Sequence, residues 1–72
     1  MFYNVWIEGF AIDRDRGAAQ YLGSIEAETF KDACVKVLLN NNWEMIYYDG
    51  LHNTYWGCNF YDNEIDAKKN YG

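Results

Sequence analysis

One stretch of the chain has the apolar spacing of a helix, and it separates two runs of strand-forming residues. Its apolar positions recur three and four residues apart, as on a helix with one buried side: Phe30, Ala33, Cys34, Val37 and Leu38. Thr29 is placed to cap the first turn, and Asp32 completes a weak capping box. The asparagines at 40–42 predict the end of the helix, because Asn accepts left-handed backbone geometry. Such a helix must bury its stripe against another element, and the flanking runs predict a β-sheet.

The run before this helix predicts a β-hairpin. Residues 2–12 and 18–27 are rich in strand formers, and the stretch DRDRG at 13–17 between them is typical of a solvated turn. Alternation along the first strand predicts one core face, made of Tyr3, Val5 and Ile7. The opposite face would carry Phe2, Asn4, Trp6 and Glu8, with Trp6 half covered.

The run after the helix predicts two further strands. Residues 43–48 would form the third strand, with Trp43, Met45 and Tyr47 on one face, followed by a turn at Asp49-Gly50. Residues 54–61 would form the fourth strand, whose core face we expect to hold Trp56, Cys58 and Phe60. Gly57 in that strand would let a helix or a ring approach the sheet closely.

The last part of the chain, residues 62–72, predicts a short closing helix. Asp62 is placed to cap it, and its acidic residues precede Lys68 and Lys69, a charge order that suits the helix dipole. Ile65 and Tyr71 would attach this helix to the rest of the protein.

The order of these elements predicts a single α+β domain over residues 1–72. Its fold would be a two-layer arrangement, an antiparallel four-stranded sheet with two helices in the order β-β-α-β-β-α. A chain of 72 residues has a marginal core, and the 19% of aromatic residues would supply most of the buried surface.

The charge balance argues against direct nucleic-acid binding. The formal net charge is −5 and only six residues are Lys or Arg, whereas affinity for nucleic acid rises with the number of phosphates neutralised. The same balance disfavours an anionic membrane surface but allows a basic protein partner. With no signal-peptide pattern, no bilayer-length apolar run and only two cysteines, we expect a cytoplasmic protein with reduced thiols.

Catalytic and metal sites find little support in the residue pattern. Cys34 and Cys58 fall on predicted core faces, and His52, the only histidine, falls in a turn, so neither a Cys-His nucleophile nor a zinc site is expected. Asp62, Glu64 and Asp66 form an acidic cluster, which we interpret as a solvated helix start. Asp62 and Asp66, together with Glu8, are the only polar constellation that an enzyme could use. We therefore expect no catalytic residue, metal or cofactor.

The remaining class of function is binding to another molecule at the protein surface, and aromatic residues are the candidates for the contacts. The sheet face away from the helices would carry Phe2, Trp6, Tyr21, Tyr48 and Tyr55. Exposed together, these rings would mark an interface; packed as cross-strand pairs, they would simply cover one another. Both arrangements stay open, because strand register does not follow from one sequence.

Three segments together resemble a group of short proteins of bacterial phages and mobile elements: VWIEGF, YLGSIEAETFKDAC and YWGCNFYDNEIDAKKNYG. The resemblance implies a small acidic protein that binds a host protein, including inhibitors of CRISPR and other defence systems. It brings no catalytic residues with it.

Our leading hypothesis is a non-enzymatic, homodimeric binding protein that engages a protein partner, in its concrete version by inhibiting a host defence nuclease. Negative potential would come from acidic residues near one end of the sheet, and contacts from aromatic residues: Asp13, Asp15, Glu26, Glu28, Trp6, Tyr21 and Tyr55. The alternative is a binding protein for a nucleotide, which would stack on the aromatic rings with Asn53 and Asn59 as polar partners.

Overall fold

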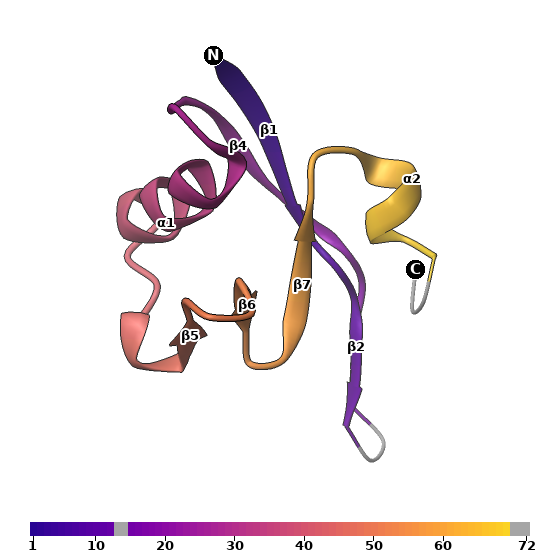
Figure 1. Ribbon diagram of the computed structural model, residues 1–72. Helices are drawn as coiled ribbons and strands as arrows, with labels where there is room; N and C mark the ends of the chain where they lie inside the picture. The colour runs from indigo at the N-terminus through magenta and orange to yellow at the C-terminus, as the bar shows by residue number, and fades with distance from the viewer. Residues whose placement is uncertain (13–14, 70–72) are drawn as a thin grey trace.

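The computed structural model describes residues 1–12 and 15–69 and has an α+β fold, as the sequence predicts (Figure 1). Its elements, in chain order, are β1 (Phe2–Ile7), β2 (Phe10–Ile12), β3 (Asp15–Gly17), β4 (Gln20–Glu26), α1 (Phe30–Asn40), the 3-10 turn η1 (Met45–Tyr47), β5 (Tyr48–Asp49), β6 (Thr54–Tyr55), β7 (Cys58–Tyr61) and α2 (Glu64–Ala67). The main sheet is antiparallel with five strands in the order β4-β1-β7-β6-β5, so the predicted count of four was wrong.

The N-terminal hairpin is confirmed and is longer than predicted. β1 pairs with β4 from Phe2 opposite Glu26 to Ile7 opposite Gln20, and β2 and β3 continue the same hairpin outward (Figure 1). The stretch predicted as a turn is therefore partly strand, since Asp15–Gly17 forms β3, while residues 13 and 14 lie outside the described residues. The register shifts after Val5, so alternation is interrupted within β1–β4.

The predicted helix and its caps are confirmed. The Thr29 side chain accepts a hydrogen bond from the Asp32 backbone N–H at 3.1 Å. At the other end Asn42 has a φ of 59°, the N–H of Asn42 donates to Leu39 O, and the N–H of Trp43 donates to Leu38 O. This pair of bonds is the Schellman motif with Asn in the left-handed position, and it fixes the direction in which the chain leaves α1 at Trp43.

The core lies between α1 and one face of the sheet. The helix buries four residues of its stripe, Ala33, Cys34, Val37 and Leu38, and Phe30 is partly buried. The sheet contributes Val5, Ile7 and Phe60, with Tyr3 packed on the cluster and its ring 5.8 Å from that of Phe30. The face expected from Tyr3, Val5 and Ile7 is thus the core face.

The second half of the sheet differs from the prediction. Residues 43–48 do not form a strand: Tyr47 N–H donates to Glu44 O, which closes the 3-10 turn η1, and only Tyr48–Asp49 pairs with β6. The expected strand at 54–61 is a hairpin, in which Tyr55 is opposite Cys58 and the chain reverses at Trp56-Gly57.

The reversal explains why the assignment of faces was wrong for this segment. Trp56 and Gly57 have φ values of 53° and 77°, and two consecutive positive values in a two-residue loop are what a type I′ turn requires. Trp56 is consequently 61% exposed at the turn and is not in the core, whereas Phe60 is buried as predicted. A Cβ at Gly57 would meet no atom within 4 Å, so the expectation that Gly57 lets a helix or a ring approach the sheet was wrong. The glycine instead allows the positive φ that the turn requires.

The closing helix is shorter than predicted and lies on the other side of the sheet. Asn63, and not Asp62, caps α2: its Oδ1 accepts from the Asp66 N–H at 2.8 Å. Ala67 is the buried residue of α2, Ile65 is 78% exposed, and Tyr71 lies outside the described residues.

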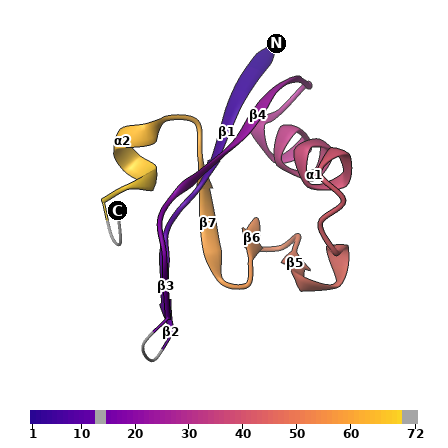
Figure 2. The ribbon, with the colours of Figure 1, turned by 180° about the vertical axis from the view of Figure 1, so that it is seen from behind.

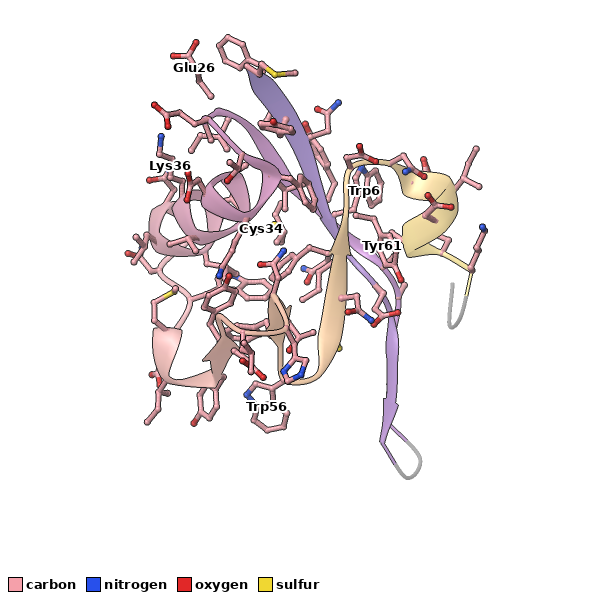
Figure 3. The ribbon with its side chains drawn as sticks, viewed as in Figure 1. Trp6, Glu26, Cys34, Lys36, Trp56 and Tyr61 are labelled. Atoms are coloured by element: carbon pink, nitrogen blue, oxygen red, sulfur yellow. The ribbon has the colours of Figure 1, made fainter. Side chains whose placement is uncertain are left out.

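The two helices flank the strands from opposite sides, so they do not form one layer of a two-layer fold (Figures 1 and 2). Trp6 and Tyr61 are cross-strand partners that lie beside α2, away from the face of Val5 and Ile7 (Figure 3). Among the described residues, the longest helix is the 11-residue α1, and neither helix has the length and apolar character that crossing a bilayer would need.

Candidate functional site

The aromatic residues predicted to contact a partner lie on two different faces. Trp6 and Tyr21 are cross-strand partners whose rings are 5.2 Å apart, and the Tyr21 hydroxyl donates to Asn4 Oδ1 at 3.0 Å. On this face the rings therefore cover one another, with Trp6 half-buried and Tyr21 half exposed. Tyr55 is on the α1 side, partly buried against the core.

The predicted acidic residues are not gathered at one end of the sheet. Glu26 and Glu28 are exposed near the N-terminal end of β1, and the backbone carbonyl of Glu26 accepts a hydrogen bond from Lys36 Nζ at 3.1 Å (Figure 3). Asp15 is in β3, toward the opposite end of the long hairpin, and Asp13 lies outside the described residues. The antiparallel hairpin thus places Asp15 far along the strands from Glu26, which their closeness in sequence did not indicate.

A groove of about 280 Å³ opens on the α1 side of the sheet. Its lining comes from the end of β1 and the residue after it, the start of β4 and the connection before it, the segment that follows α1, and the β6–β7 hairpin: Ile7, Glu8, Ala18, Gln20, Trp43, Tyr55, Trp56 and Cys58. We call this the aromatic groove. Sequence reasoning missed it, since Trp56 and Cys58 were assigned to the interior of a continuous strand.

The three rings that line the aromatic groove, Trp43, Tyr55 and Trp56, belong to a row of packed rings that also includes Tyr47. The centroids of Trp43 and Tyr55 are 4.9 Å apart, those of Tyr55 and Tyr47 are 6.2 Å apart, and those of Tyr47 and Trp56 are 5.2 Å apart. The Trp56 backbone N–H also donates to Tyr47 O at 3.1 Å. Each ring is therefore held by a neighbour, although Trp56 and Tyr47 remain 61% and 45% exposed.

Glu8 places a carboxylate in the wall of the groove. The residue is only 8% exposed, and its Oε2 accepts hydrogen bonds from the Asn59 backbone N–H at 2.6 Å and from Asn59 Nδ2 at 3.0 Å. The Glu8 N–H in turn donates to Asn59 O at 3.0 Å, so β1 and β7 are tied at this point. Buried carboxylates need such donors, and here they hold the charge at a defined position.

The two thiols are poorly suited to nucleophilic chemistry. Burial raises the pKa of the Cys34 thiol to about 11, and its sulfur accepts from Asn53 Nδ2 at 3.7 Å. The pKa of Cys58 is also raised, first by burial and then by the negative charge of Glu8. Both thiols are protonated at neutral pH, and the thiolate is the reactive form. His52 bonds instead to Asp49, Nδ1 to Oδ2 at 2.7 Å, which lowers the pKa of that carboxyl.

The acidic residues at the start of α2 form hydrogen bonds and ion pairs with neighbouring residues of the same segment. Asn63 Nδ2 donates to Asp62 and to Asp66, while Lys68 pairs with Glu64 at 2.7 Å and Lys69 with Asp66 at 3.1 Å. Within residues 1–12 and 15–69, no three His, Cys, Asp or Glu side chains are grouped so that they could hold a metal ion.

Comparison with family models, curated proteins and solved structures finds no match to this chain.

Proposed function

We propose that the protein acts by binding a protein partner with a basic surface, and that it catalyses no reaction. The single observation that carries the proposal is the exposed Trp56 indole, which is held at a position where its residue type is unfavourable. Backbone of this left-handed kind costs an ordinary L-residue about 1–2 kcal/mol, and Gly, Asn or Asp would normally occupy it. Retaining a bulky, exposed Trp there is understandable if the indole has a contact to make outside the molecule.

The surroundings of Trp56 have the composition of an interface. Tyr47 packs on it. Ile46 in η1 and Leu51 in the turn between β5 and β6 are 81% and 88% exposed, and β5, β6 and the β6–β7 turn lie at the same end of the molecule (Figure 1). Trp and Tyr are the residue types that most often dominate binding energy, and exposed apolar residues that gather in one place mark interaction surfaces.

The sign of the charge selects the class of partner. The chain has a formal net charge of −5, from eleven Asp and Glu residues against six Lys and Arg. Charge complementarity accelerates association with a basic surface and disfavours an acidic one. The resemblance to short phage proteins supplies a more specific version, an inhibitor that occupies the nucleic-acid groove of a host defence nuclease. The homodimer expected from the sequence is likewise a proposal, tested by sedimentation.

The proposal is tested with a capture experiment that uses matched variants. The protein and its Trp56→Asn variant are used to capture partners from bacterial lysate, and a captured protein is purified for titration at several salt concentrations. Loss of a hot-spot side chain typically costs 2 kcal/mol or more, so Trp56→Asn should weaken binding at least about 30-fold. Ile65→Gln removes an exposed apolar side chain on the α2 side and should leave the affinity unchanged.

The charge component has its own measurement. Added salt should weaken the complex. Neutralising Glu26 and Glu28 should mainly slow association, since Glu26 lies far from Trp56 (Figure 3) and Glu28 is two residues further along the chain. Equal affinity of the Trp56→Asn and Ile65→Gln variants would refute the proposed surface. For the nuclease version, cells that carry a CRISPR defence should lose restriction of phage plating when they express the chain, and unchanged restriction would reject it.

The alternative function, binding of a small flat ligand such as a nucleotide, is favoured by one observation, the aromatic groove itself. Its volume of about 280 Å³ is near the lower end of small-ligand sites, roughly 300–1,000 Å³. Its expected polar partners are occupied, because Asn53 bonds Tyr48 and Cys34 while Asn59 bonds Glu8. A thermal-shift screen against nucleotides tests it, since a ligand that binds only the native state raises the melting temperature.

A further inference from the structure

The 3-10 turn η1 and the β6–β7 turn meet at two aromatic residues, Tyr47 and Trp56. Their ring centroids are 5.2 Å apart with an angle of 58° between the planes, and the Trp56 backbone N–H donates to Tyr47 O at 3.1 Å. We infer that Tyr47 is a positioning residue, which holds the exposed Trp56 indole in one orientation before the partner binds. The inference rests on the proposed function, because it explains how the side chain that meets the partner is kept ready for binding.

The Trp56 indole needs such a neighbour because most of its surface is open to solvent. The residue is 61% exposed, and Gly57, which follows it in the turn, has no side chain that could pack on the ring. An exposed side chain exchanges among about three staggered χ1 rotamers within picoseconds to nanoseconds. Among the described residues, Tyr47 is the one aromatic residue whose ring packs on the indole.

Tyr47 can position another side chain because it is itself fixed at two points. Its backbone N–H donates to Glu44 O at 3.3 Å, which closes η1. Its ring also meets the Tyr55 ring edge-on, at 6.2 Å between centroids and 79° between planes. Tyr55 is partly buried against the core, so the contacts lead from the core through Tyr55 and Tyr47 to the exposed indole.

The backbone and the ring of Tyr47 act on different parts of Trp56. The Tyr47 carbonyl bonds the Trp56 backbone N–H and so continues the β5–β6 ladder by one bond beyond the pair Tyr48–Tyr55. The Tyr47 ring contacts the Trp56 side chain. Substitution of the Tyr47 side chain therefore removes the ring contact and leaves a carbonyl at the same position, so that the two effects are separable by experiment.

Loss of the Tyr47 ring should weaken binding through the population of the competent indole orientation. When only a fraction of the molecules presents the binding orientation, the apparent dissociation constant rises by the inverse of that fraction. With about three χ1 rotamers accessible, roughly a third of the molecules would be competent, so affinity should fall about threefold. A side chain that is already ordered avoids this cost of binding.

The positioning is measured in the free protein by nuclear magnetic resonance. In ¹⁵N-labelled protein each tryptophan indole N–H gives its own signal, and the Trp56→Asn variant lacks one and so assigns it. Relaxation of the Trp56 indole ¹⁵N is compared among the unmodified protein and the variants Tyr47→Ala, Tyr47→Phe and Ile46→Ala. Tyr47→Phe keeps the ring, and Ile46→Ala removes an 81% exposed aliphatic side chain from the same turn.

We expect the order parameter of the Trp56 indole to be near that of rigid backbone, about 0.85, in the unmodified protein, Tyr47→Phe and Ile46→Ala. In Tyr47→Ala it should fall below about 0.6. The Trp6 indole, which packs on Tyr21 on the other face, should be unchanged in every variant. A captured partner should bind Tyr47→Ala about threefold more weakly or worse and Tyr47→Phe within about twofold of the unmodified protein.

An ordered Trp56 indole in Tyr47→Ala would overturn the inference even if the partner bound this variant more weakly, since Tyr47 would then be a contact and not a positioning residue. Equal mobility in Tyr47→Ala and Ile46→Ala would overturn it too, because it would show a general loosening of the turn. So would a mobile Trp56 indole in the unmodified protein, a measurement that stands even if Tyr47→Ala does not fold.

The inference and the proposed function fail under different results. Any of the outcomes that overturn the positioning leaves the proposed function standing if Trp56→Asn still loses partner capture. Conversely, a Trp56 indole that becomes mobile only in Tyr47→Ala, together with unchanged partner capture by Trp56→Asn, would reject the proposed interface and not the role of Tyr47.

Discussion

The type I′ turn at Trp56-Gly57 leads to a prediction that separates backbone strain from side-chain contact. Trp56→Asn creates an Asn-Gly turn, the sequence that type I′ geometry most favours. Trp56→Ala removes the same indole but leaves a residue with ordinary preferences at a φ of 53°. Both variants lose the indole. The difference between their free energies of unfolding therefore reports the difference in backbone preference at position 56.

The expected magnitudes follow from the exposure of the residue. Trp56 is 61% exposed, so somewhat over a third of its surface is covered, and the Tyr47 ring, 5.2 Å away between centroids, is one of the groups that cover it. On the scale of 150–250 Å² for a fully buried aromatic residue, this is about 60–100 Å², worth at most about 1.5–2.5 kcal/mol. Trp56→Ala should lower the free energy of unfolding by up to this amount. Trp56→Asn should recover about 1 kcal/mol of it, because Asn tolerates the left-handed region.

The assay is urea unfolding of the three proteins, followed by circular dichroism because the variants lack one tryptophan. For a domain of this size, a difference of about 1 kcal/mol between the Asn and Ala variants corresponds to about 4–8 °C in Tm. Equal stability of the two variants would refute the reasoning, since it would mean that the turn imposes no cost on an ordinary residue at position 56. A more stable Ala variant would contradict the turn type itself.

Three further predictions concern α1 and its core. Thr29→Ala should cost about 1 kcal/mol by removing the acceptor for the Asp32 N–H, while Thr29→Ser should be nearly neutral; equal loss in both, measured by urea unfolding, would contradict the cap. Leu38→Ala, at a fully buried position, should cost about 2–5 kcal/mol and leave so small a domain largely unfolded by circular dichroism, whereas Leu39→Ala at a 55% exposed position should be mild; similar losses would disprove the assigned helix face. The raised pKa of Cys34 means that the folded state keeps its proton while the unfolded state releases it above the ordinary value of 9.0. Stability should therefore be fully present below about pH 9 and fall as pH rises toward about 11. Cys34→Ala should lessen this fall, and an unchanged pH slope in that variant would exclude Cys34 as its source.

The parts of the fold that were predicted correctly depend on local patterns. The stripe and caps of α1 could be read from residues 29–42, because helix contacts and capping bonds join residues at most a few positions apart. The N-terminal hairpin followed similarly from two strand-forming runs around a charged turn, and its core face of Tyr3, Val5 and Ile7 was correct.

The errors came from places where a turn interrupted an apparently continuous strand. Trp-Gly is not a usual turn pair, so alternation was carried through Trp56 and placed its indole in the core. In the same way, the 3-10 turn at Met45–Tyr47 interrupts the strand that was predicted over residues 43–48. Gly57 was the one local signal that could have indicated the reversal, because Gly adopts positive φ values more readily than other residues.

By itself the sequence determined an α+β domain with one amphipathic helix, a long N-terminal hairpin and an acidic overall charge. These are properties of composition and of short-range periodicity. Only the tertiary structure decided that Trp43, Tyr55, Trp56 and Glu8 surround one groove, while Trp6 and Tyr21 pair on the opposite face. The physical reason is that strand partners and the sense of a reversal are set by long-range packing, and a single turn residue determines the side on which every later side chain lies.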